Sequence, residues 1–314
     1  MDTKLVIDPA NVKSKIVEFI RSTLEKRDIE GLVLLYRDCI ESIINIHIAI
    51  ETVGRENVKV LVTKGRFIVK QPWEEMGINE INKFLNLPVE NIVFANKENT
   101  LREIRTIFSE GYEVKFSSMF SDGVPTSLNY NLSYLLLREI AKKEIEKKTY
   151  APPKKKPKSP REKFIHKTIA HHKSQIRLSV LLAFLLAESE NKSFIGSVNK
   201  TEWLLGLFTK FGTYHAADFL PLACLYRTQV VQLANHFGLQ DFLKTKSFQT
   251  PSSYKYFFNL TFEEVDRILV RLESNLSVDK IFSDTGIAKE TIEKVNYYYQ
   301  ASSYARNVPL IPNL

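Results

Sequence analysis

In the N-terminal part of the chain, segments with hydrophobic residues at helical spacing alternate with short continuous apolar runs. Asp8 followed by a proline is typical of a helix start, and apolar residues at helical spacing continue over 9–26. Residues 31–35 (GLVLL) and 58–62 (VKVLV) are short continuous apolar runs, typical of strands buried on both faces, and 40–52 between them has a helical pattern. Strand, helix and strand in this order predict a parallel sheet.

The same kinds of pattern predict further elements along the chain. The expected strands are 91–95, 112–116 and 193–197, and the expected helices are 100–109, 132–148, 165–188, 277–284 and 288–300. Thr261 and Glu264 form a capping box ahead of another apolar helix. We therefore expect one domain over 1–314: an α/β, Rossmann-like doubly wound parallel sheet with a helical C-terminal extension at 260–314.

The charge of the chain is concentrated in one segment. The formal net charge is +8, and residues 142–168 alone hold eleven Lys or Arg against three Glu. Four prolines and four lysines within 151–160 predict a mobile loop at about 149–163. The segment is interpreted as a solvated loop or as an electrostatic contact with nucleic acid or an acidic partner. It lacks the regular aromatic residues that would stack on bases.

Composition limits the cellular setting and the kinds of site. The longest clean apolar run, 180–187, is far shorter than a membrane span, and acidic residues within 1–20 do not fit a signal peptide. Cys39 and Cys224 are the only cysteines, and their spacing is not that of a metal site. These features predict reduced thiols and a cytoplasmic location.

The most informative stretch is 196–218, GSVNKTEWLLGLFTKFGTYHAAD, which continues as FLPLACLYRTQVVQLA over 219–234. It resembles the ammonia-dependent NAD synthetase family of ATP pyrophosphatases, where the corresponding run reads like GTGNKTE…TKYGDG…D-I-L-P-I-G-D-L-Y-K-T-Q-V. The matching positions are Asn199, Lys200, Thr201, Glu202, Thr209, Lys210, Gly212, Asp218, Pro221, Leu225, Tyr226, Thr228, Gln229 and Val230. Matches at fixed spacing over this length indicate common ancestry.

This resemblance implies an activity, in which ATP activates deamido-NAD as an adenylate and ammonia displaces AMP to give NAD. It also implies Mg²⁺ and ATP as cofactors, deamido-NAD or NAD as ligands, and a homodimer. Carried over position by position, it implies magnesium ligands at Glu41 and Glu202 and a nucleotide contact at Ser197. It further implies substrate contacts at Arg177, Lys210 and Asp218. No catalytic residue can be assigned.

The nucleotide loop departs from the family pattern. The family's S-G-G-x-D-S, placed after the first strand, falls on Arg37, Asp38, Cys39, Ile40, Glu41 and Ser42. Only Ser42 is identical, Glu41 keeps a carboxylate, and Asp38 and Cys39 replace both glycines. Side chains there block close backbone approach to phosphates, and Asp38 adds a negative charge. Arg37 is an alternative phosphate contact, but the loop is predicted not to bind ATP as the family does.

Other family positions have changed as well. Cys224 replaces an acidic residue, Gln175 replaces the first of two arginines, and 304–305 replace a final His-Lys pair. The segment 246–262, which in the family carries acidic groups around the reacting phosphate, contains no acidic residue.

Three hypotheses follow from these residues. The first is a divergent synthetase relative with weak or lost activity, acting as a nucleotide sensor or as a silent subunit beside an active paralogue. The second is an active synthetase in which Arg37, Glu41 and Glu202 handle ATP and magnesium. The third is a non-enzymatic binder of nucleic acid or an acidic partner through 142–168, and DNA recognition by the helix pair within 277–300 is a further alternative.

Overall fold

The structure is a computed structural model. It describes residues 2–37, 39–64, 78–97, 99–100, 103, 160–212, 216–244 and 253–306. The helices are α1 (Pro9–Arg27), α2 (Ile40–Val53), α3 (Ile78–Asn82), α6 (Pro160–Ser189), α7 (Lys200–Leu205), α8 (Arg227–His236), α9 (Gln240–Leu243), α11 (Ser253–Phe258), α12 (Phe262–Glu273), α13 (Val278–Thr285), α14 (Lys289–Ala301) and α15 (Ser303–Arg306). Short 3₁₀ turns are η1 (Thr3–Leu5), η2 (Arg55–Asn57) and η4 (Val89–Asn91).

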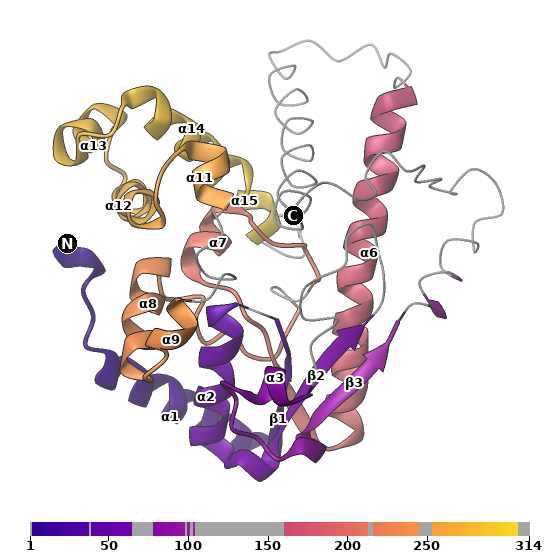
Figure 1. Cartoon of the computed structure of the whole chain (residues 1–314). Helices are drawn as coiled ribbons and strands as arrows, with labels where there is room; N and C mark the ends of the chain where they lie inside the picture. The colour runs from indigo at the N-terminus through magenta and orange to yellow at the C-terminus, as the bar shows by residue number, and fades with distance from the viewer. Residues whose placement is uncertain are drawn as a thin grey trace, which may run out of the picture.

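The described strands form a parallel sheet. They are β1 (Gly31–Leu35), β2 (Val58–Lys64), β3 (Ile92–Asn96) and β4 (Lys192–Ile195), in the order β3-β2-β1-β4. Helices cover both faces, with α1 and α2 on one side and the long α6 on the other (Figure 1). The α/β fold class with a parallel sheet and flanking helices is therefore confirmed.

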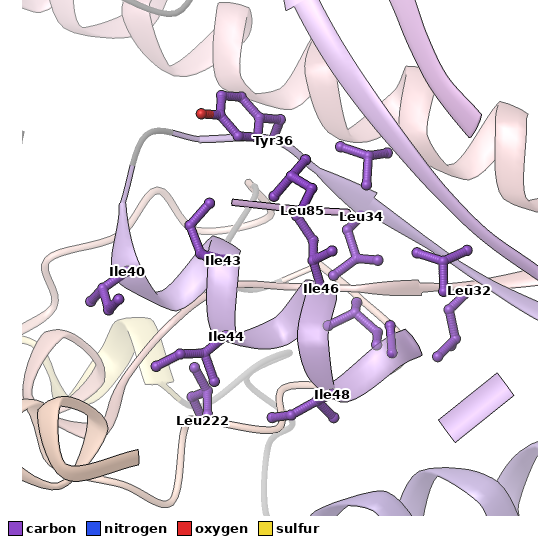
Figure 2. Close-up of a cluster of buried hydrophobic side chains, with 14 of the residues drawn as sticks. Leu32, Leu34, Tyr36, Ile40, Ile43, Ile44, Ile46, Ile48, Leu85 and Leu222 are labelled. Atoms are coloured by element: carbon purple, nitrogen blue, oxygen red, sulfur yellow. The ribbon is translucent and has the colours of Figure 1, made fainter. Parts of the chain in front are cut away.

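Strand β1 shows why its sequence is apolar throughout. Leu32 and Leu34 point into the core shared with α1 and α2, whereas Val33 and Leu35 pack with α6 on the opposite face. All five residues of the strand are buried. A strand with one solvent-exposed face would alternate polar and apolar residues, whereas β1 is covered on both faces and is apolar throughout. Figure 2 shows the isoleucines of α2, from Ile40 to Ile48, alongside Leu32 and Leu34.

The C-terminal helices have a hydrophobic cluster of their own. Residues of α12, α13 and α14 pack together with Leu5 from the N-terminal turn and with α7. Arg271 of α12 also forms an ion pair with Asp2 at 2.5 Å, which joins the start of the described chain to these C-terminal helices. The capping box at Thr261 and Glu264 is confirmed, with hydrogen bonds of 2.8 and 3.2 Å.

Several predicted boundaries are corrected by the structure. Helix α6 begins at Pro160 rather than at residue 165, so the loop expected at 149–163 is wrong for 160–163. Proline suits the first turn of a helix, where its missing N–H has no intrahelical partner. Strand β2 extends to Lys64, and β4 ends at Ile195 rather than 197, where the chain turns away and the Gly196 N–H bonds Phe219 O at 2.9 Å.

Some predictions lie outside the described residues. They are the strand at 112–116, the helix at 132–148, most of the helix at 100–109, the segment 151–159 and residue Asp38.

Candidate functional site

The predicted nucleotide loop (37–42) and the loop at 196–199, called the Asn199 loop here, meet at the carboxyl edge of the sheet. The nucleotide loop follows β1, the Asn199 loop follows β4, and these two strands are hydrogen-bonded neighbours. Crevices at this edge, outside the ends of neighbouring parallel strands, are where open α/β sheets bind ligands. The fold therefore brings the predicted nucleotide loop next to the loop that carries Ser197 and Asn199, and Asn199 Nδ2 lies 2.8 Å from Glu41 Oε1.

The backbone of the nucleotide loop donates its hydrogen bonds internally. The Arg37 N–H bonds Ser42 Oγ at 3.2 Å, and the Cys39 N–H bonds the Arg37 carbonyl at 2.7 Å. Ser42 Oγ, which is buried, donates in turn to Leu35 O at 3.2 Å. Backbone N–H groups of such loops are the donors that cradle phosphates in nucleotide sites. Two of those donors are used within the loop, and the Ser42 hydroxyl is used by the end of β1.

Cys39 stands at the N-cap of α2 without a side-chain capping bond. Burial, and after it the negative charge of Glu41, raises the pKa of the Cys39 thiol to about 12. A thiol with a raised pKa stays largely protonated at neutral pH and is therefore a poor nucleophile.

Glu41 lies at the centre of a buried polar group. Its carboxylate Oε1 accepts hydrogen bonds from Asn199 Nδ2 at 2.8 Å and from the guanidinium Nη1 of Arg227. The side chains of Glu41 and Arg227 are only 3% and 16% exposed. Burial by itself raises the pKa of Glu41, but Arg227 and Asn199 more than offset this and hold the pKa below its ordinary value. Glu41 is thus ionised and already paired with a cation.

Glu202 of α7 is in the opposite state. Its N–H donates to Asn199 Oδ1 at 2.9 Å, which caps α7, but its buried Oε2 has no hydrogen-bond partner among the described residues. Burial, and then the nearby charge of Glu41, raises the pKa of Glu202 to about 8. The two carboxyls therefore share one site with their pKa values pushed apart, as expected for like charges at short range.

A buried carboxylate, that of Asp266, holds the first turns of α7 and α8 in place. Asp266 of α12 accepts hydrogen bonds from Thr201 Oγ1 and from the N–H and Oγ1 of Thr228, the last two at 2.8 and 2.7 Å. Thr201 Oγ1 also accepts the Arg227 N–H at 2.9 Å. Asp266 thereby fixes the start of α7 and the start of α8, and with them the positions of Glu202 and Arg227.

Ser197 is held by a neighbour that the sequence did not single out. Asn45, one turn after Glu41 on α2, donates from Nδ2 to Gly196 O at 3.1 Å and lies 3.4 Å from Ser197 Oγ. Asn45 is fully buried, and Ser197 is almost so. This contact joins α2 to the turn that follows β4.

The side chains of two predicted substrate residues, Arg177 and Asp218, form hydrogen bonds with backbone groups. Arg177 of α6 donates from Nε and Nη2 to the Lys210 carbonyl at 3.3 and 3.0 Å, and Lys210 Nζ lies 5.6 Å from the Phe211 ring centroid. Asp218 accepts the Phe194 N–H at 2.9 Å and lies 3.6 Å from Arg27. Arg177 and Lys210 are brought together by these bonds, whereas Asp218 is tied to β4 and α1.

Sequence reasoning missed Arg227, Asp266 and Asn45. A signal existed for Arg227, which stands where the similar family pattern has lysine (L-Y-K-T). Asp266 lies inside an amphipathic helix and Asn45 inside a largely buried one, and neither has a local pattern that marks it. Over the described residues, no group of three or more His, Cys, Asp or Glu side chains is placed to hold a metal ion. The described helices are also all too short or too polar to span a bilayer.

Comparison with known proteins identifies the family to which the chain is similar. The NAD synthase family model matches residues 131–309. The chain is similar to the NH(3)-dependent NAD(+) synthetase of Hyperthermus butylicus, with 33% identity over 146 residues, or 44% of this chain and 51% of that protein. The synthetase of the same description from Methanosarcina acetivorans is 22% identical over 312 residues, covering 98% of this chain and all of that protein.

Solved structures agree on the fold. The NMN synthetase of Francisella tularensis superposes with a TM-score of 0.63 at 17% identity, covering 98% of this chain and 100% of that one. The NH3-dependent NAD synthetase of Campylobacter jejuni gives 0.62, also at 17% identity and with the same coverage of both chains. Since the family model covers more than half of the chain and the fold agrees, this protein belongs to the NAD synthase family.

Proposed function

We propose that this protein is a divergent NAD synthase family member in which the ATP-dependent amidation of deamido-NAD is weak or lost. The observation that carries the proposal is the nucleotide loop, whose Arg37 and Cys39 N–H groups are bonded within the loop and whose Ser42 hydroxyl is bonded to Leu35 at the end of β1. A phosphate that used these donors would have to break these bonds.

The residue types in the loop support the same conclusion. Glycine allows the backbone to approach a phosphate because it has no Cβ, and Asp38 and Cys39 both have one. Asp38 also brings a carboxylate to a place where the family binds phosphate anions. Without a bound and oriented ATP, the carboxylate of deamido-NAD is not activated for attack by ammonia.

The residues at the expected magnesium position do not fit that ion. Mg²⁺ is held in proteins by ionised carboxylates and water, in near-octahedral geometry. Here the buried carboxylate of Glu41 is already paired with the guanidinium of Arg227, which stands where the ion would have to bind. No catalytic step through Mg²⁺ is therefore derived for this chain.

The test is a ligand-binding series on the wild type and on the Asp38→Gly/Cys39→Gly double variant. A ligand that binds only the folded state raises the melting temperature. We expect no shift of the wild type with Mg-ATP and a shift of the double variant, because the glycines reopen the loop. A clear wild-type shift with Mg-ATP, accompanied by NAD formation from deamido-NAD and ammonia, would refute the proposal.

The same series defines the remaining role. A shift with deamido-NAD or NAD alone supports a dinucleotide sensor. No shift with any of the three supports a silent subunit, which pairs with itself or with an active paralogue. Analytical ultracentrifugation of the protein, alone and mixed with an active synthetase, distinguishes those assemblies.

A second candidate function is an active synthetase with an altered loop. The observation in its favour is the buried Oε2 of Glu202, which has no hydrogen-bond partner in the described part of the chain. Glu202 also lies close enough to Glu41 for the negative charge of Glu41 to raise the pKa of Glu202. In this alternative Arg227 leaves Glu41 when ATP and a metal enter, and Arg37 contacts the phosphates. Glu202→Gln separates the two functions, because it abolishes NAD formation only if the wild type makes NAD.

A further inference from the structure

We infer that the pairing of the Arg227 guanidinium with Glu41 keeps divalent cations out of the Glu41–Glu202 site. The inference deepens the proposed function and rests on it for the location of the site. It concerns the charge balance of this site, which the loop sequence does not address.

The Oε1 atom of Glu41 is already occupied. It accepts hydrogen bonds from Arg227 and from Asn199, and the carboxylate is almost fully buried. A metal ligand has to offer oxygen lone pairs to the ion, and those of Oε1 are directed at nitrogen donors instead.

The backbone of Arg227 is fixed in place. It is the first residue of α8, and its N–H is bonded to Thr201 Oγ1, which Asp266 holds. A cation at a helix N-terminus is disfavoured by the helix dipole, so this position needs a compensating anion. Glu41 supplies that anion across a separation of 186 residues in sequence.

The kind of cation also matters. A guanidinium is weakly hydrated and presents a planar set of donors that matches a carboxylate, whereas Mg²⁺ gives up its water reluctantly. Because both side chains are buried, Arg227 balances Glu41 at a lower desolvation cost than a divalent ion. A divalent ion beside Arg227 would in addition be repelled by its charge.

Glu202 is the second carboxylate of the site, and its buried Oε2 has no hydrogen-bond partner among the described residues. A metal ion that used this oxygen together with Glu41 would have to displace Arg227 from Glu41.

The experiment measures metal binding directly, with Mn²⁺ as the probe and electron paramagnetic resonance of free Mn²⁺ as the readout. We expect the wild type to bind no equivalent of Mn²⁺. Arg227→Gln, which keeps hydrogen-bond donors and removes the charge, is expected to bind one equivalent. The Glu41→Gln/Arg227→Gln double variant is the matched control and is expected to bind none.

Two results would overturn the inference. One is a wild type that binds one equivalent of Mn²⁺ and loses it in the Glu41→Gln/Arg227→Gln variant. The other is a folded Arg227→Gln protein, verified by circular dichroism, that still binds none. If Arg227→Gln does not fold, Arg227→Lys replaces it, because a shorter point charge leaves part of Glu41 open. That variant must then bind more Mn²⁺ than the wild type, and equal binding would overturn the inference.

Failure of this inference can be distinguished from failure of the proposed function. A wild type that binds Mn²⁺ but forms no NAD overturns the role given to Arg227 and leaves the proposed loss of activity intact. A wild type that forms NAD without binding Mn²⁺ does the reverse.

Discussion

Asp266 provides the sharpest test of how the site is held, and Asp266→Asn is the perturbation. The carboxylate is fully buried and accepts three hydrogen bonds, one from Thr201 and two from Thr228. An asparagine has one acceptor oxygen and turns an NH₂ toward the remaining donor. Losing one such bond and leaving a buried donor unsatisfied costs about 1–3 kcal/mol.

The cost of this substitution depends on pH in a defined direction. Burial raises the pKa of Asp266 from 3.8 to about 6, although the hydrogen bonds from Thr201 and Thr228 oppose the shift. The folded state therefore holds a proton that the unfolded state has released, and this contribution is lost as pH rises through about 6. At about 1.4 kcal/mol per pKa unit, the total is about 3 kcal/mol, of which about 1.4 kcal/mol is lost between about pH 5 and pH 7.5.

Urea unfolding of the wild type and Asp266→Asn at both pH values measures the difference. The destabilisation by the variant should be about 1.4 kcal/mol larger near pH 5 than near pH 7.5. Asp241→Asn is the matched control for the same chemical change at a carboxylate that is 83% exposed. A cost for Asp266→Asn that is the same at both pH values, or larger at the higher one, would refute the reasoning.

Three further predictions concern packing, thiols and capping. Gly212→Ala should lower the free energy of unfolding by about 1–3 kcal/mol, because an added Cβ would lie 2.8 Å from Ile176 Cγ2; urea unfolding measures this, and an unchanged midpoint contradicts it. Cys224, which is exposed, should react with a thiol reagent well before Cys39, whose pKa is about 12, and peptide mapping that finds Cys39 labelled first would contradict this. Asn199→Ala should cost about 2 kcal/mol or more, because it removes both an N-cap and a buried bond to a carboxylate, and a melting temperature equal to that of the wild type would count against this.

The sheet could be predicted from the sequence because its signals are local. GLVLL at 31–35 is buried on both faces, the helix after Asp8 begins at Pro9, and the Thr261–Glu264 capping box is present, all as the patterns indicated. Each of these features depends on residues that are close in the chain. The start of α6 was missed because Pro160 ends a proline-rich run that masks a helix start.

The charge balance of the site could not be read in the same way. Glu41 and Glu202 were singled out through the family resemblance, but the partner that decides the state of Glu41 comes from α8, far away in sequence. Asp266 is similar, because its helix looks like an ordinary amphipathic one and its three donors lie on other elements. Long-range pairing of buried polar groups has no sequence period, so only the folded chain shows it.

The central claim is that this family member keeps the scaffold and has lost most of the synthetase activity. The most direct measurement is NAD formation from deamido-NAD, ATP, Mg²⁺ and ammonia, with the Methanosarcina acetivorans synthetase assayed beside it at equal concentration. We predict turnover by this protein that is at least about a hundredfold lower, which corresponds to about 3 kcal/mol of lost transition-state stabilisation. Turnover within about tenfold of that relative, a difference of about 1.4 kcal/mol, would contradict the account.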